Sequence, residues 1–179
     1  MNNIENQIQL LRAEEQDKPV IRNLMQYYQY DTTEYNNDDP SSFGLFDYKY
    51  LDHYWTDYGK EIEGRVAYII KISDSLAGFA LVNNYSVFNK DSNTKTIAEF
   101  FIMRKWRKKG IGKDIAFRIL DTHEGLWEVK QEKENIIAQK FWESVVNQYT
   151  DGRYRKHESH QPEWDGPIIY FNKQIEGHS

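Results

Sequence analysis

Residues 96–123 constrain the fold more than any other stretch, because three kinds of local structure follow one another there without a gap. Thr96 to Met103 forms the most apolar strand candidate of the chain, with the β-branched and aromatic residues typical of buried strands. A turn containing Gly110 and Gly112 follows, and residues 112–123 then carry apolar side chains at helical spacing. The segment therefore predicts a strand, a tight turn and a helix.

The rest of the chain adds strands and helices in a mixed order. The apolar periodicity predicts strands at 8–12, 66–72, 76–82, 126–130, 152–156 and 168–172, and further helices at 17–28, 47–55 and 135–146. No internal repeat or domain linker interrupts the sequence, so we expect a single domain over residues 1–179. The order favours an α/β (α+β) fold, in which helices flank a mixed, twisted central sheet of about seven strands.

The composition excludes several classes of protein. The formal net charge of −5 argues against a nucleic-acid-binding protein, which would need a concentrated basic face. The absence of cysteine excludes a disulfide framework and a thiolate metal site, and the five histidines show no spacing typical of metal ligands. The first residues lack a signal peptide, and no apolar window is long enough to span a bilayer. We therefore expect a cytoplasmic protein with no metal, nucleic-acid or membrane partner.

The turn after Met103 has the chemistry of an anion site. Exposed N–H groups at a helix start converge on an anion, and the helix dipole adds to the attraction. Five cationic side chains surround this turn in an otherwise acidic protein: Arg104, Lys105, Arg107, Lys108 and Lys109. A phosphate group is therefore the expected guest.

Two common phosphate motifs do not fit this turn. The P-loop needs a glycine five residues before its Gly-Lys pair and a Ser or Thr after it, but Arg107 and Asp114 occupy those positions. The dinucleotide fingerprint needs a small residue where Ile115 stands and an opening βαβ unit, whereas this turn lies past the middle of the chain.

The remaining pattern, Arg-x-x-Gly-x-Gly after an apolar strand, resembles the coenzyme A pyrophosphate motif of the GNAT N-acetyltransferase superfamily, and residues 107–112 match it residue for residue. The segment 135–142 resembles the Asn-x-x-Ala-x-x-Phe/Leu-Tyr segment that ends the cofactor site in that superfamily. The resemblance covers nearly the whole chain, including the hairpin that ends in Ala77-Gly78-Phe79-Ala80. The pairs Trp127-Glu128 and Phe141-Trp142 are similar to those of a bacterial group of predicted acetyltransferases.

This resemblance implies acetyl-CoA as the cofactor, with no metal. It also implies that the strand ending at residues 102–104 splays away from its neighbour, so that its backbone pairs with the pantetheine arm. The cofactor-binding residues implied in this way are Ile102, Met103, Arg104, Arg107, Lys108, Lys109, Gly110, Ile111, Gly112, Lys113, Asp114, Ile115, Asn135, Phe141 and Trp142.

The implied reaction is direct attack of a substrate amine on the thioester, and it requires a base that removes a proton from the amine. Glu99 is the first candidate, because it lies on the motif strand among apolar residues that would raise its pKa. Glu128 on the next strand is the second candidate, and the sequence does not choose between them. Many members of the superfamily use a tyrosine acid where this chain has Trp142, whose indole cannot serve. Either Tyr149 replaces it, or the thiolate takes a proton from water.

The acceptor is expected to bind near the N-terminal third, where aromatic residues alternate with acidic ones, an arrangement suited to a cationic amine. The residues named for this role are Tyr28, Tyr30, Asp31 and Glu34. We predict an N-acetyltransferase that acts on a primary amine of a small, polyamine-like molecule. The alternatives are a non-catalytic acetyl-CoA-binding module and a protein or peptide N-acetyltransferase, and a homodimer is compatible with any of them.

Overall fold

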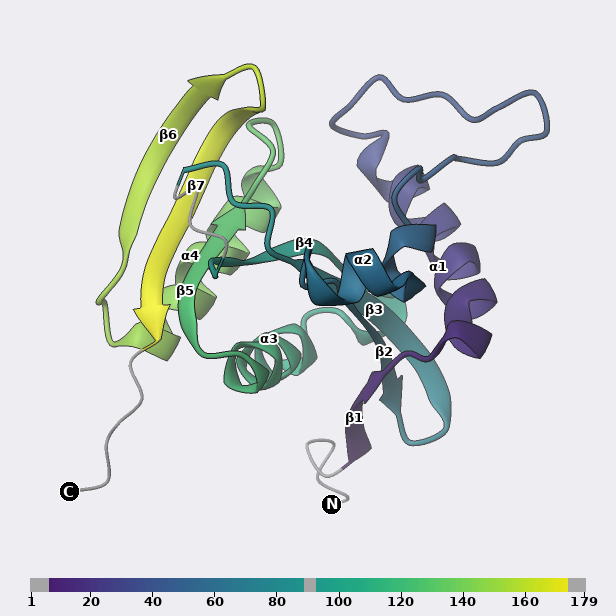
Figure 1. The fold of residues 1–179 in the computed structure, drawn as a ribbon, viewed down its shortest axis with the longest axis horizontal. Helices are drawn as coiled ribbons and strands as arrows, with labels where there is room; N and C mark the ends of the chain where they lie inside the picture. Colours follow the sequence, from purple (N-terminus) through teal and green to yellow (C-terminus); the bar gives the residue numbers. More distant parts are fainter. Residues whose placement is uncertain (1–6, 89–92, 174–179) are drawn as a thin grey trace.

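The computed structural model describes residues 7–88 and 93–173 and arranges them around one seven-stranded sheet (Figure 1). The strand order is β1-β2-β3-β4-β5-β7-β6, and every neighbouring pair is antiparallel except β4 and β5, which are parallel. The predicted fold class, a mixed sheet flanked by helices, is confirmed. The strands are β1 (Ile8–Arg12), β2 (Val66–Ile72), β3 (Ser75–Asn83), β4 (Lys95–Ile102), β5 (Gly125–Lys130), β6 (Arg155–Gln161) and β7 (Trp164–Lys173).

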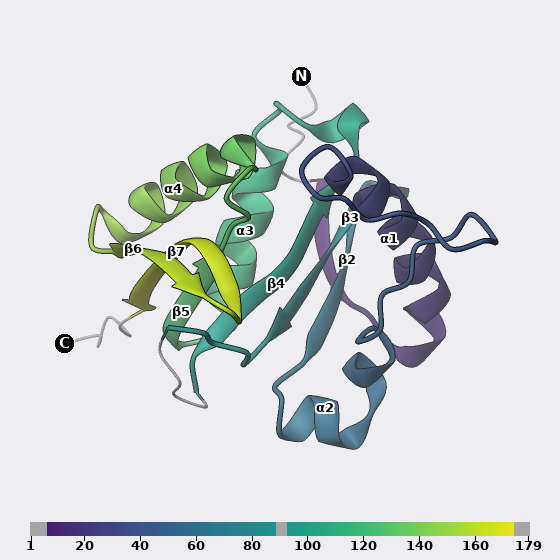
Figure 2. The same ribbon diagram turned by 90° about the horizontal axis from the view of Figure 1, so that it is seen from above.

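Helices cover both faces of the sheet and enclose a separate apolar core on each (Figure 2). On one face lie α1 (Lys18–Thr32), the short 3₁₀ helix η3 (Asp52–Trp55) and α2 (Asp57–Glu61), and on the other lie α3 (Ile111–Thr122) and α4 (Ile136–Thr150). Two further 3₁₀ turns, η2 (Glu15–Asp17) and η4 (Arg104–Trp106), precede α1 and α3. In the described ranges, no helix has the length and apolar content needed to cross a bilayer.

Strand β4 contributes two irregularities that shape the middle of the sheet. Its register against β3 pairs Val82 with Ile97 and Leu81 with Glu99, so Ala98 is an extra residue in a β-bulge. Its parallel pairing with β5 covers only residues 95–97, and beyond Ile97 the two strands diverge. The splay that the family resemblance implies is therefore present, and it leaves one edge of β4 open.

The helix predicted at residues 47–55 is wrong for most of its length, because only Asp52–Trp55 forms a 3₁₀ turn. Side chains of α1 hold the preceding main chain in a non-helical path. Gln26 exchanges two hydrogen bonds with the main chain of Phe46 (2.8 and 2.9 Å), and Gln29 donates to the carbonyl of Asp47 (3.1 Å). These bonds occupy backbone groups that a helix would need, and they bring Tyr48 against α1.

The last elements are longer than the sequence pattern indicates. The strand predicted at 168–172 extends at both ends as β7, and the helix predicted to end at residue 146 continues to Thr150. The strand predicted at 152–156 is wrong for residues 152–154, because β6 begins only at Arg155 and runs to Gln161. Strand β6 forms the edge of the sheet and is polar on both faces, so it lacks the alternation that marks a half-buried strand. Strand β7 contains Gly166 and Pro167, which normally argue against a strand.

Candidate active site

The turn before α3 presents main-chain N–H groups for which residues 7–88 and 93–173 supply no acceptor. The first main-chain hydrogen bond of α3 runs from Asp114 N to Gly110 O (3.1 Å), so the amides of Ile111, Gly112 and Lys113 have no acceptor within the helix. Gly110 adopts a left-handed conformation with φ of +79°, and a Cβ added there would meet no atom within 4 Å. An open turn with free amides at a helix N-terminus can hold a diphosphate.

Other residues of this predicted cofactor segment serve the fold with their side chains. Ile111 and Ile115 are buried in the core between the sheet and α3. The carboxylate of Asp114 pairs with Arg118 one helical turn later (3.0 Å). These three residues can therefore contribute to an anion site only through their backbone, which is how the glycine motif is expected to work.

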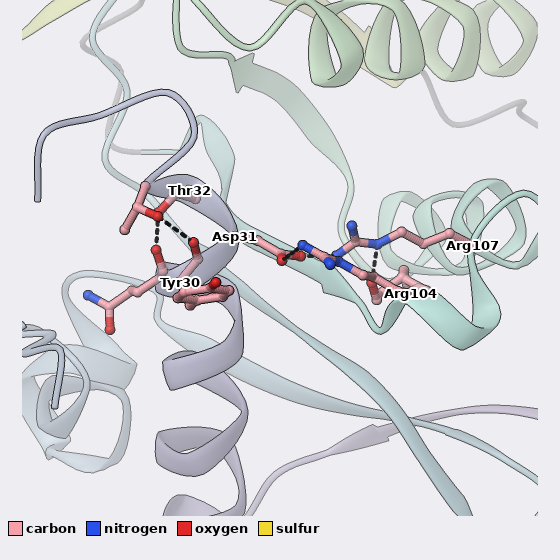
Figure 3. A network of polar contacts seen from close by, with 8 residues as sticks. Tyr30, Asp31, Thr32, Arg104 and Arg107 are labelled. Atoms are coloured by element: carbon pink, nitrogen blue, oxygen red, sulfur yellow. Dashed lines mark hydrogen bonds and ion pairs between the residues drawn. The ribbon is translucent and has the colours of Figure 1, made fainter. Parts of the chain in front are cut away.

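Both arginines of the turn reach across to α1 (Figure 3). Nη2 of Arg104 donates to one oxygen of Asp31 (2.7 Å), and Nη2 of Arg107 donates to the other (2.5 Å). Nε of Arg107 also donates to the carbonyl of Ile102 (2.6 Å), the last residue of β4. Asp31 lies in the last turn of α1, where the helix dipole disfavours a carboxylate, and the two guanidinium groups offset that cost. This arginine bridge ties α1 to the turn.

Replacing Asp31 with asparagine should weaken this bridge without affecting the core. We expect the free energy of unfolding to fall by ~1 kcal/mol at low salt, and by less in 1 M NaCl, because both arginines are well exposed. Urea unfolding at the two salt concentrations measures the effect, with Glu34→Gln as the control for loss of a nearby carboxylate. If the loss is equal in both variants or insensitive to salt, the bridge does not stabilise the protein.

The open edge of β4 offers further hydrogen-bonding groups. Met103 N donates to Ala77 O on β3 (2.8 Å). The N–H and C=O groups of successive residues point alternately to the two sides of a strand. The backbone groups of Phe100 and Ile102 therefore face away from β3, toward the open edge. The carbonyl of Ile102 is occupied by Arg107, and the carbonyl of Met103 accepts from Trp106 N (2.8 Å). Among the backbone groups predicted to pair with the pantetheine arm, the amide of Ile102 therefore faces the open edge. The backbone of Phe100 faces the same edge.

Three aromatic rings pack between the open edge of β4 and α4. Phe100 lies 5.8 Å from Phe141 and 5.1 Å from Trp142, measured between ring centroids, and Trp142 is buried. A Cβ at Gly112 would lie 3.2 Å from the Phe141 ring, so the glycine allows α3 to approach α4 closely. Asn135 caps α4 by accepting from Ala138 N (2.9 Å). Gly112, Phe141 and Trp142 therefore pack together beside the open edge of β4, and Asn135 starts the helix that carries two of them.

Glu99 lies where the sheet opens, two residues past the last β4–β5 pair. Its register partner Leu81 belongs to the core under α1, so the Glu99 side chain projects from that face. Burial raises the pKa of Glu99 from its ordinary value to about 7, while interactions with the hydroxyls of Tyr28 and Tyr48 oppose the rise. A carboxyl group with this pKa can act as a base near neutral pH.

Glu128 has a different environment. Its fully buried carboxylate accepts hydrogen bonds from Ser86 Oγ (2.5 Å), Val87 N (2.8 Å) and Phe88 N (3.1 Å). It stands opposite Thr96, in the part of the sheet where β4 and β5 remain paired. These contacts anchor the segment after β3, and the geometry favours Glu99 over Glu128 as the base.

Tyr149 lies at the opposite end of α3 from the glycine turn. Its hydroxyl donates to Asp121 (2.8 Å), one residue before the end of that 12-residue helix, and burial together with Asp121 raises the pKa of the phenol. Tyr149 is therefore far from the glycine turn and has a phenol with a raised pKa, so it is poorly suited to protonate a thiolate near Trp142.

The residues predicted to bind the acceptor have different surroundings. Tyr28 packs on Phe79 and Phe101 and interacts with Glu99, whereas Tyr30 is 66% exposed and Glu34 is exposed. Tyr48 is one of the aromatic residues that the sequence places near the acceptor, but the sequence does not indicate its interaction with Glu99. Its position depends on the hydrogen bonds that Gln26 and Gln29 make to the loop, and no periodicity indicates these. Among the described residues, no group of three or more His, Cys, Asp or Glu side chains could hold a metal ion.

Comparisons with known proteins agree with this geometry. The model of the acetyltransferase (GNAT) family matches residues 24–146. No protein of curated function matches the sequence. Among solved structures, an acetyltransferase from Thermus thermophilus aligns with a TM-score of 0.64 at 11% identity and covers 92% of this chain and 96% of its own.

Two other structures represent different acceptors. The aminoglycoside acetyltransferase AAC(6′)-Ib, solved with paromomycin and acetyl-CoA, has a TM-score of 0.62 at 12% identity over 92% of this chain and 93% of its own. The ribosomal-protein-S18-alanine N-acetyltransferase from Escherichia coli has a TM-score of 0.58 at 10% identity, and the alignment covers 96% of this chain and 97% of its own. At such identities the structures establish a shared fold, and the family match extends over most of the chain. This protein belongs to the acetyltransferase (GNAT) family.

Proposed function

We propose that this enzyme transfers an acetyl group from acetyl-CoA to a primary amine of a small cationic molecule by direct attack. The observation that carries the proposal is the position of Glu99, a carboxyl group with a pKa of about 7 on the open stretch of β4. It stands between a turn suited to a diphosphate and a helix face rich in tyrosine.

The donor side follows from the free backbone groups. The amides of Ile111, Gly112 and Lys113 would bind the diphosphate, and the open edge at Phe100 and Ile102 would pair with the pantetheine arm and polarise the acetyl carbonyl. Acetyl-CoA supplies the acetyl group as a thioester. The structure of AAC(6′)-Ib with acetyl-CoA supports this choice of donor for the fold.

Glu99 would remove the proton from the attacking amine, directly or through one water molecule. The glycine turn belongs to the α3 and α4 face of the sheet, and Glu99 projects from the α1 face. The splay of β4 from β5 lies between them, so donor and acceptor can approach the reacting carbon from opposite faces. A positioned base typically contributes ~10²–10⁴-fold to the rate.

The charge around Glu99 supports a cationic acceptor. Burial raises the pKa of Glu132, and the nearby carboxylates of Glu134 and Asp38 raise it further. Glu132 in turn raises the pKa of Glu99, while the ammonium group of Lys130 lowers it. Carboxylates from two loops and the rings of Tyr28 and Tyr48 therefore converge near one position, and a molecule with several amino groups would relieve their repulsion.

Departure of the thiolate would not require a protein acid. Trp142 is buried against Phe100 and Phe141, and Tyr149 is bound to Asp121. The thiolate is a stable leaving group and would take its proton from solvent. A cytoplasmic location and assembly as a homodimer stay predictions from the sequence.

A thiol-release assay with a panel of amines tests the proposal. The chain contains no cysteine, so a thiol reagent would report coenzyme A alone. We expect turnover with diamines, polyamines or aminoglycosides, and mass spectrometry should detect an N-acetyl product. Turnover with peptides only would identify a protein acetyltransferase, and binding of acetyl-CoA without turnover of any amine would contradict the proposal.

A further inference from the structure

The loop between α1 and η3 is held on the fold by few contacts. In the described part of the chain, Tyr48 is the one residue of 33–50 that packs against a hydrophobic core. Phe43 and Leu45 are exposed, and a cavity of about 710 Å³ lies between part of the loop and α1. Phe46 and Tyr48 both line this cavity. Apolar packing alone therefore does not fix the path of the chain that leads into Tyr48.

Gln26 supplies a two-point attachment where this packing is missing. Its Nε2 donates to Phe46 O (2.9 Å), and its Oε1 accepts from Phe46 N (2.8 Å). A glutamate at this position would lack the donor, and a methionine would lack the whole amide. Gln29 adds one bond from its Nε2 to Asp47 O (3.1 Å). The main chain is thus fixed at the two residues that immediately precede Tyr48.

Side chains from several elements surround the Glu99 carboxyl group. The titratable groups that act on it are Tyr28 on α1, Tyr48 on the loop, Tyr54 on η3, Lys130 on β5 and Glu132 just after β5. Burial raises the pKa of Glu99, whereas the hydroxyls of Tyr28 and Tyr48 lower it by stabilising the carboxylate. Tyr28 is fixed by its packing on Phe79 and Phe101. Tyr48 is therefore the hydroxyl partner of Glu99 whose position the loop controls.

We propose that Gln26 is a positioning residue for acetyl transfer: its two bonds to Phe46 hold the Tyr48 hydroxyl against Glu99, so that the phenol donates to the carboxylate that receives the amine proton. The inference rests on the proposed function, in which Glu99 is the base. When the attachment of the loop is lost, the phenol no longer stabilises the carboxylate, and the base stays protonated to a higher pH. A glutamine outside the reacting centre thus sets the pH range in which the enzyme works.

The pH dependence of kcat tests this inference, measured at saturating substrates with one acceptor amine, whose own ionisation is then common to all variants. Tyr48→Phe removes the hydroxyl, and we expect the acid limb to move up by about one pH unit, because a hydrogen bond to a charged group is lost. Gln26→Met should move the limb in the same direction by a comparable amount. The plateau at high pH should stay within about threefold of the wild-type value in both variants, because the base is kept.

The double variant Gln26→Met/Tyr48→Phe separates positioning from two independent effects. If Gln26 acts through Tyr48, the limb of the double variant should lie where Tyr48→Phe alone places it. Gln16→Met on η2 replaces an exposed glutamine and is the matched control, with its limb at the wild-type position. A purely structural role of Gln26 would lower the unfolding temperature without moving the limb. If Gln26→Met does not fold, Gln29→Met loses a single bond to the loop and should give a smaller shift of the same sign.

Three results would overturn the inference while leaving Glu99 as the base. A wild-type limb in Gln26→Met, beside a shifted one in Tyr48→Phe, would show that the bonds to Phe46 do not position the phenol. Additive shifts in the double variant would show that Gln26 acts on Glu99 by another route. An unshifted limb in Tyr48→Phe would exclude the phenol from control of the base. A wild-type enzyme without an acid limb near pH 7 would instead contradict the assignment of Glu99, and with it the proposed function.

Discussion

Replacing Glu99 with glutamine should lower kcat by ~10²–10⁴-fold, the usual contribution of a positioned base. The pH profile should change as well. The carboxylate form is the active one and the pKa of Glu99 is about 7, so the wild-type rate should rise with pH through that value and then level off. This acid limb should be absent from the residual activity of the variant. Steady-state kinetics from about pH 5.5 to about pH 9 would measure both effects.

The Glu99→Gln variant should be more stable than the wild type at alkaline pH, although it is less active. The pKa of Glu99 is higher in the folded protein than in the unfolded chain, so the folded state binds the proton more tightly and loses that advantage as the pH rises through 7. A glutamine at this position does not ionise, so the variant does not lose stability as the pH rises through 7. We expect the variant to be more stable than the wild type at pH 8 by ~1–2 kcal/mol, after allowance for solvent screening, and of similar stability at pH 4.

Two controls separate the candidate bases. Glu124→Gln removes an exposed carboxylate in the turn between α3 and β5 and should leave the kinetics unchanged. Glu128→Gln disturbs a buried carboxylate with three hydrogen bonds and should lower the unfolding temperature while the acid limb near pH 7 is retained. If the limb vanishes in Glu128→Gln and persists in Glu99→Gln, the assignment of the base is wrong.

Gly110→Asp should abolish the thermal stabilisation by acetyl-CoA. A ligand present at about 100 times its Kd stabilises the folded state by ~2.7 kcal/mol, so the wild-type protein should melt at a clearly higher temperature with the ligand. In the variant a carboxylate would enter the open space beside the free amides, and like-charge contact with a diphosphate costs several kcal/mol. Differential scanning fluorimetry with and without acetyl-CoA makes the comparison.

Gly110→Asn is the matched control for this substitution. Asparagine and aspartate have nearly the same size, and both tolerate the left-handed conformation that Gly110 adopts. The asparagine variant should therefore share any backbone strain and keep much of the thermal shift, because it adds no charge. An unchanged shift in Gly110→Asp would place the cofactor elsewhere on the molecule.

The strand, turn and helix that would hold acetyl-CoA can be predicted from the sequence, because the residues that form them are close together in the chain. A strand, a glycine turn and a helix follow one another within residues 96–122, and the conformations that free the amides depend on residues within that stretch. Glu99 is a candidate base from the sequence for the same reason, since it lies on the strand that leads into the turn, but the sequence does not choose between it and Glu128. The positions of most strands along the chain also follow from local periodicity, apart from the polar edge strand β6.

The acceptor half depends on contacts between segments that are distant in the sequence. Asp31 meets Arg104 and Arg107, which lie 73 and 76 residues away, and its role in bridging them carries no local signal. Tyr48 reaches Glu99 because two glutamine side chains of α1 fix the loop, and the same bonds prevent the predicted helix. A carboxylate or tyrosine in such a segment can be assigned a role only when the path of the chain is known.

The separation of the two cores has a consequence for engineering. The elements that would hold the donor pack in the core under α3 and α4, whereas the loop between Thr32 and Leu51 packs on the other core and contributes Tyr48 to the surroundings of Glu99. A transplanted loop that begins after Thr32 would retain both Asp31 and Tyr28. New amine specificities could therefore be selected by exchanging one surface segment while the machinery for the thioester is kept intact.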